Sequence, residues 1–79
     1  MVHTKDTQLI QRQIESHLQG VKASVSSSDG VHFSARVVGG VFAGHSRVAQ
    51  QRMVYQAISH WIESGDIHAI SISTSVEDE

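Results

Sequence analysis

Histidine is the residue type in this sequence most able to carry chemistry. The 79-residue chain has six histidines, at positions 3, 17, 32, 45, 60 and 68, and no cysteine. A neutral imidazole can bind a metal ion or exchange a proton near neutral pH. No two of these histidines are three or four residues apart, so no pair is spaced to bind a metal on one face of a helix. Disulfides, zinc–thiolate sites and thiol nucleophiles are excluded, and any thiolate ligand must come from a partner.

The histidine in the most unusual position is His68. It belongs to the segment DIHAISIS, residues 66–73, whose alternation predicts a β-strand with His68 facing the same way as Ile70 and Ile72. On an apolar face, Val or Leu would be buried without needing a hydrogen-bond partner. Two interpretations stay open: a histidine at the edge of the core, bonded to backbone or water, or a metal ligand at the mouth of the strand.

His32 begins another alternating segment, VHFSARVV. If this strand and the last one are parallel neighbours, His32 and His68 lie at the same end of the sheet. However, His32 alternates with Phe33, so we expect it on the opposite, solvent-facing side. Asp29 is a weak third candidate, because an Asp-Gly turn explains the residue better than a ligand role does.

The elements that must position these residues can be predicted from the patterning. Ile10, Ile14 and Leu18 recur every four residues and predict a helix over about 6–19, with Thr4 or Asp6 as its N-cap and Gly20 as a stop. Alternation predicts strands over about 21–26 and 31–38, joined by a Ser-Ser-Asp-Gly turn.

A longer helix is predicted from Ser46, a good N-cap, to Gly65. Its apolar stripe is expected to contain the following residues: Val48, Val54, Tyr55, Ile58, Trp61 and Ile62. A last strand over about 67–75 follows directly.

The order α-β-β-α-β indicates an α+β fold. A helical crossover usually joins parallel strands, so we expect a three-stranded mixed sheet with both helices on one face. The chain is predicted to be a single domain, 1–79, folded over about 6–75 with an acidic tail at 76–79.

Charge and motifs narrow the function classes. The net charge is −2 and the six Lys and Arg residues are spread along the chain, which argues against strong nonspecific phosphate binding. Arg47 and Arg52 could meet phosphate, but on a helix they point about 140° apart, so a solvated basic helix is the simpler interpretation. No nucleophile elbow, HExxH or P-loop is present, which favours a non-enzyme. There is neither an apolar run of about 20 residues nor a signal-peptide core, so we expect a cytoplasmic protein that does not bind membranes.

Four landmarks resemble the BolA family: HF at 32–33, FAGHSRV at 42–48, QRMVYQAI at 51–58 and IHAISI at 67–72. The short DGVHF hairpin is similar to that of its IbaG-like branch, and the resemblance spans about residues 6–75. It implies a fold similar to a class II KH domain. It also implies a non-catalytic protein that partners a monothiol (CGFS) glutaredoxin and co-ligates a 2Fe–2S cluster with it and glutathione.

Within this resemblance, His68 is the expected main ligand, His32 a second one, and Asp29 stands where some branches carry a cysteine. We expect a monomer, or a heterodimer with the glutaredoxin. The alternative is a nucleic-acid-binding stress-response or transcriptional regulator that uses Arg47 and Arg52. The triplet Gln50-Gln51-Arg52, where many relatives are more basic, weakens that alternative. A purely structural interaction domain without metal stays open.

Overall fold

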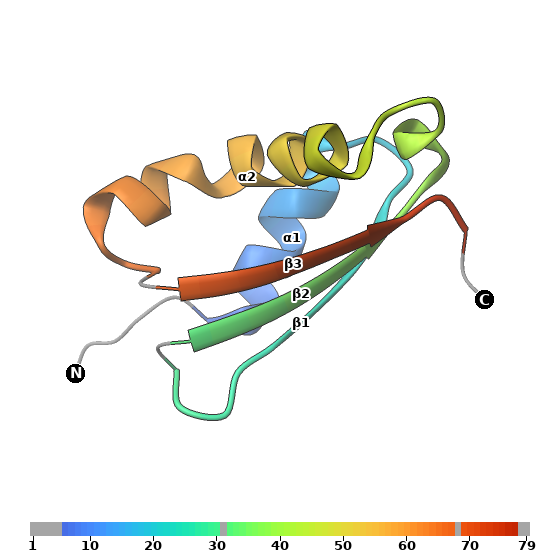
Figure 1. The fold of residues 1–79 in the computed structure, drawn as a ribbon. Helices are drawn as coiled ribbons and strands as arrows, with labels where there is room; N and C mark the ends of the chain where they lie inside the picture. Colours follow the sequence, from blue (N-terminus) through green and yellow to red (C-terminus); the bar gives the residue numbers. More distant parts are fainter. Residues whose placement is uncertain (1–5, 31, 68, 78–79) are drawn as a thin grey trace.

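Two helices cover one face of a three-stranded sheet (Figure 1). The computed structural model describes residues 6–30, 32–67 and 69–77. The elements are α1 (Thr7–His17), β1 (Lys22–Ser26), β2 (His32–Val38), the short 3-10 helix η1 (Gly40–Phe42), α2 (Arg47–Ser64) and β3 (Ala69–Ser75). The strand order is β1-β2-β3, with β1 antiparallel and β3 parallel to β2. The predicted α+β class, element order and mixed sheet are confirmed.

Both long helices begin and end at residues that suit those positions. The Asp6 carboxylate accepts a hydrogen bond from the Gln8 N–H at 3.2 Å and caps α1, whereas Thr4 lies outside the described residues. The Ser46 hydroxyl accepts from the Ala49 N–H at 3.1 Å and caps α2. Gly65 ends α2 with φ +88°, a left-handed conformation that favours glycine.

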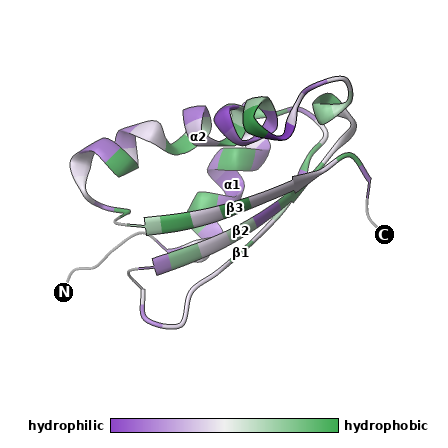
Figure 2. Ribbon diagram, in the orientation of Figure 1, coloured by the Kyte–Doolittle hydropathy of each residue, from purple (hydrophilic) through white to green (hydrophobic). Residues whose placement is uncertain are grey.

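The core lies between the helices and the inner face of the sheet. Along β2, Phe33, Ala35 and Val37 are buried while the residues between them are exposed. Hydrophobic and polar positions alternate along β2 and β3 (Figure 2). The fully buried large side chains are Ile10, Ile14, Val37, Phe42, Val54, Ile58 and Ile67.

The predicted apolar stripe of α2 is partly wrong. Val54 and Ile58 are fully buried, but Val48 is 62% exposed and Tyr55 42% exposed. The helix packs on β3 and α1, and β3 is the last strand of the sheet. In the part of the chain that the structure describes, no further strand lies beyond β3 to cover the flank of α2 that carries Val48 and Tyr55.

Two glutamine side chains of α2 form hydrogen bonds with β3. The buried Thr74 hydroxyl donates to Gln50 Oε1 at 2.6 Å, while Gln50 Nε2 donates to the carbonyls of Phe42 and His45 at 3.2 and 2.8 Å. Gln51 Nε2 donates to the Ile72 carbonyl at 3.2 Å. These bonds position the start of α2 relative to the edge of the sheet.

In the described part of the chain, no helix has the length and apolar character needed to cross a membrane.

Candidate functional site

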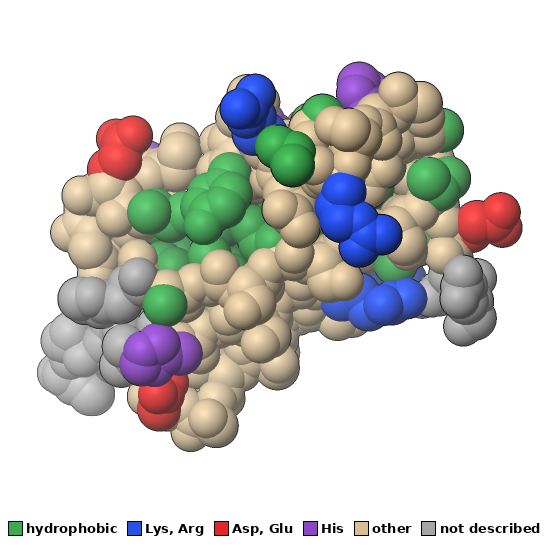
Figure 3. Space-filling model, in the orientation of Figure 1, with side chains coloured by type: hydrophobic (Ala, Val, Ile, Leu, Met, Phe, Trp, Pro, Cys, Tyr) green, Lys and Arg blue, Asp and Glu red, His purple; other side chains and the backbone are tan. Residues whose placement is uncertain are grey.

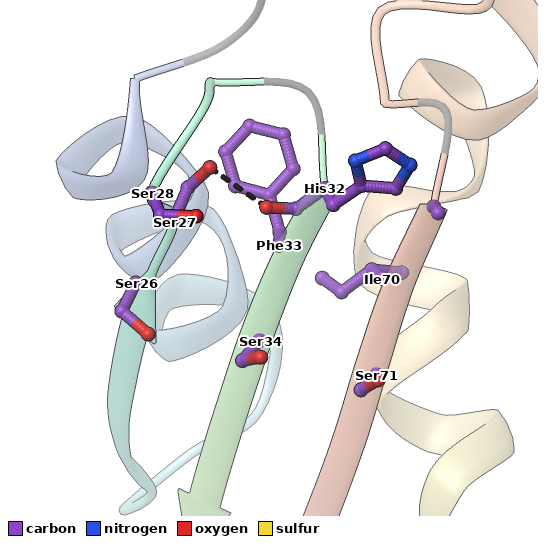
Figure 4. Close-up of a pocket in the computed structure, with 9 residues that line it drawn as sticks. Ser26, Ser27, Ser28, His32, Phe33, Ser34, Ile70 and Ser71 are labelled. Atoms are coloured by element: carbon purple, nitrogen blue, oxygen red, sulfur yellow. Dashed lines mark hydrogen bonds between the residues drawn. The ribbon is translucent and has the colours of Figure 1, made fainter.

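The turn between β1 and β2 holds His32 at the first position of β2. Gly30 has φ +74°, and its N–H donates to Ser27 Oγ at 2.8 Å. Ser27 Oγ in turn donates to the His32 carbonyl at 2.7 Å (Figure 4). Asp29 Oδ1 accepts from the His32 N–H at 2.9 Å. Short-range bonds within the turn therefore position the histidine backbone from both sides.

The His32 side chain is paired with Asp29. His32 Nδ1 lies 2.9 Å from Asp29 Oδ2, and the two side chains are 68% and 49% exposed. This contact favours the tautomer that carries its proton on Nδ1, which leaves the lone pair of Nε2 available. Metal-binding histidines are commonly oriented by a carboxylate in this way. Asp29 is therefore engaged in orienting His32 and in holding the turn.

His32 lies beside the first residue of β3. The parallel register pairs His32 with Ala69, and Figure 4 shows the imidazole extending from β2 toward β3. As expected, His32 is exposed and lies on the side of β2 opposite to Phe33. His68, the expected main ligand, lies outside the described residues; in the sequence it directly precedes Ala69. The register thus places Ala69, which follows His68 in the sequence, opposite His32.

Next to His32, the face of the sheet that the helices leave open has a shallow depression of about 580 Å³. Besides His32, Phe33, Ala69 and Ile70, its lining residues are the serines Ser26, Ser27, Ser28, Ser34 and Ser71. Hydroxyls are weak ligands for iron, so among the described residues that line this depression the His32 imidazole is the strongest metal donor.

The donor set suits a shared metal centre. Among the described residues, no group of three or more His, Asp or Glu side chains could enclose a metal ion, and the sequence has no cysteine. Iron–sulfur clusters need thiolates, although two imidazoles can replace two thiolates on one iron. A cluster held at His32 would therefore need thiolate ligands from another molecule.

The remaining candidates lie elsewhere. Arg47 and Arg52 are both exposed, on the first turns of α2. Their spacing places them on different sides of the helix. His45 and His17 are exposed, and the exposed His60 ring lies 4.6 Å from the Trp61 ring. None of these residues joins the site around His32.

Sequence reasoning missed the pairing of Asp29 with His32 and the contacts of Gln50 and Gln51 with β3. A spacing of Asp and His three residues apart across a glycine turn could have indicated the first. Gln51 and Ile72 are separated by 21 positions in the chain, and Gln50 and Thr74 by 24. No local sequence pattern indicates such long-range contacts.

Comparisons with known proteins agree on one family. The sequence model described as "BolA-like protein" matches residues 6–79. Acid stress protein IbaG of Escherichia coli strain K12 is 46% identical over 46 residues, which are 58% of this chain and 55% of IbaG. The chain therefore aligns with about half the length of the curated relatives that it matches.

Solved structures are similar over nearly the whole chain. A bolA protein homologue from Coxiella burnetii superposes with a TM-score of 0.79 and 34% identity, covering 92% of each chain. The BolA domain of SufE1 from Arabidopsis thaliana has a TM-score of 0.73 and 29% identity, covering 89% of this chain and 90% of that one. The XC975 protein has a TM-score of 0.62 and 36% identity, covering 95% and 92%.

Proposed function

The chain belongs to the family of BolA-like proteins, and from that premise we propose that it is a non-catalytic partner of a monothiol glutaredoxin of the CGFS type. Together with that glutaredoxin and glutathione it would hold a 2Fe–2S cluster used in iron–sulfur assembly, trafficking or iron sensing. The single observation that carries the proposal is the Asp29–His32 pair at the mouth of β2, beside the first residue of β3.

The chemistry of the donors supports a shared cluster. His32 offers Nε2 while Asp29 orients its ring. His68 stands one residue before the register partner of His32 in the sequence, and it is the ligand that the family resemblance implies. Two imidazoles could serve one iron, and the glutaredoxin and glutathione thiolates would serve the rest.

The test is a titration of cluster-loaded CGFS glutaredoxin with the purified protein, followed by visible absorption and circular dichroism. We expect the spectrum to change on mixing and the change to be lost in His68→Asn and strongly reduced in His32→Asn. His45→Asn is the matched control, since His45 is exposed but lies before α2, away from this site. An unchanged spectrum with the native protein, or equal losses in all three variants, would refute the proposal.

The alternative, a nucleic-acid-binding regulator, has weaker support. Arg47 and Arg52 are exposed but point to different sides of α2, and the chain has a net charge of −2. Binding through these residues is expected to be weak and to fall steeply with salt. Submicromolar DNA binding at physiological salt, lost in Arg52→Ala, would reverse the order of the two proposals.

A further inference from the structure

The outer edge of β3 presents backbone groups that no other described strand pairs with. In a parallel ladder, alternate residues of an edge strand bond to the neighbouring strand and the others point outward. The Gly39 N–H continues the ladder by donating to the Ser75 carbonyl at 3.0 Å. The backbone N–H and C=O groups of Ser71, Ser73 and Ser75 therefore point toward β2. Ile70 and Ile72 therefore direct their N–H and C=O groups away from the sheet.

An independent contact confirms this direction. Gln51 Nε2 of α2 donates to the Ile72 carbonyl from outside the sheet, at 3.2 Å. Its carboxamide occupies the place where the N–H of an added strand would lie. Among the described residues, the outward N–H groups of Ile70 and Ile72 have no corresponding acceptor.

The flank of α2 next to this edge is apolar and uncovered. Val48, Gln51 and Tyr55 follow the spacing i, i+3, i+7 and thus lie on one side of the helix. Val48 is 62% and Tyr55 42% exposed, while Ile70 and Ile72 are only half-buried. Figure 3 shows hydrophobic side chains gathered between α2 and β3. We call the set Val48, Gln51, Tyr55, Ile70 and Ile72 the α2–β3 surface.

The charges nearest to Val48 on α2 are positive. Along α2 the Lys, Arg, Asp and Glu residues are Arg47, Arg52 and Glu63, and β3 carries none. Arg47 and Arg52 lie within four residues of Val48, whereas Glu63 is two turns beyond Tyr55. Figure 3 shows Lys and Arg side chains above and to the right of the hydrophobic patch, and an acidic side chain near its upper left end. An uncharged edge strand lacks the charged side chains with which edges usually avoid pairing, and the neighbouring arginines favour carboxylates in whatever pairs with it.

We propose that the α2–β3 surface binds an extended, acidic segment of a partner protein, which adds a strand to the outer edge of β3. The outward N–H and C=O groups lie on every second residue of β3, which is the spacing at which an added β-strand forms its main-chain hydrogen bonds. Alternate apolar side chains of the segment pack on Val48 and Tyr55, and its carboxylates face Arg52. The hydrogen bond from Gln51 Nε2 to the Ile72 carbonyl breaks, and this carbonyl then accepts a hydrogen bond from a main-chain N–H of the segment. This interaction goes beyond the proposed cluster function and requires neither His32 nor His68.

The test uses the full chain and a synthetic peptide as long as β3, which alternates Val and Thr, carries Asp at both ends and has blocked termini. Titration is followed by ¹H–¹⁵N correlation spectra and amide hydrogen exchange. We expect shift changes at the amides of Ile70, Ile72 and the Val48–Tyr55 flank, and slower exchange at Ile70 and Ile72. A peptide with Lys in place of Asp is expected to bind more weakly.

Tyr55→Ser is expected to weaken binding about tenfold, as for an aromatic anchor at an interface. Gln56→Ser is the matched control: Gln56 is also exposed but lies about 100° around α2 from Tyr55, and the substitution should change binding by less than about twofold. Val48→Ser, at the more exposed position, provides a second variant should Tyr55→Ser disturb the fold. The proposal is overturned if saturating peptide shifts no amide of β3, if Tyr55→Ser and Gln56→Ser weaken binding equally, or if the surface instead binds an oligodeoxynucleotide or a second copy of this chain.

Discussion

Replacing Thr74 by Val tests whether the bond between β3 and Gln50 holds the start of α2 in place. Thr74 is 6% exposed and its hydroxyl donates to Gln50 Oε1 at 2.6 Å. Val has nearly the same shape, so the substitution removes the donor without creating a cavity. Gln50 cannot rotate its amide to compensate, because Nε2 already donates to the carbonyls of Phe42 and His45.

The expected loss of stability arises because Gln50 Oε1 no longer has a hydrogen-bond donor. An unsatisfied, partly buried acceptor costs about 1–3 kcal/mol. We expect the lower half of this range, since Gln50 is only part-buried and water can reach it in part. For a domain of this size the free energy of unfolding is on the order of 5–10 kcal/mol, and a loss of about 1–2 kcal/mol lowers Tm by roughly 5–15 °C.

The assay is urea denaturation with thermal melts, followed by far-UV circular dichroism. Thr74→Ser keeps the hydroxyl and should recover most of the stability. Ser73→Ala, which removes an exposed hydroxyl from the neighbouring position of β3, should change stability by less than about 0.5 kcal/mol. The reasoning fails if Thr74→Val is as stable as the native protein, or no less stable than Ser73→Ala.

Three further predictions concern the site and the backbone. Asp29→Asn should weaken the cluster-dependent complex with glutaredoxin about 10-fold or more, because His32 loses the carboxylate that orients it; an unchanged titration in visible circular dichroism would show that the pair has no part in ligation. Because imidazole binds metal only when neutral, the same complex should weaken between about pH 7 and pH 5.5 while far-UV circular dichroism stays native; a complex equally strong at both pH values would argue against imidazole ligands. Gly65→Ala should destabilise the fold by about 1 kcal/mol because φ is +88° there, whereas Gly40→Ala, which has open space and no such φ, should have little effect in the same urea experiment.

Much of this protein was determined by local patterns that the sequence alone displays. Alternation along VHFSARVV predicted which side of β2 would be buried, and the structure buries Phe33, Ala35 and Val37. Ser46 and Gly65 marked the ends of α2 because capping depends on groups within one turn of the helix. The α-β-β-α-β order and the BolA-like family followed from the same short-range information.

Tertiary structure decided the features that depend on where the sheet ends and on how distant segments meet. The repeat of apolar residues in α2 included Val48 and Tyr55, yet both are exposed because β3 is an edge strand and no further strand of the described residues lies beyond it to cover them. Helical periodicity specifies a direction on the helix, while burial requires a partner surface in that direction. The contact of Gln51 with Ile72 and the placing of His32 opposite Ala69 likewise depend on strand register and helix packing, which join residues far apart in the chain.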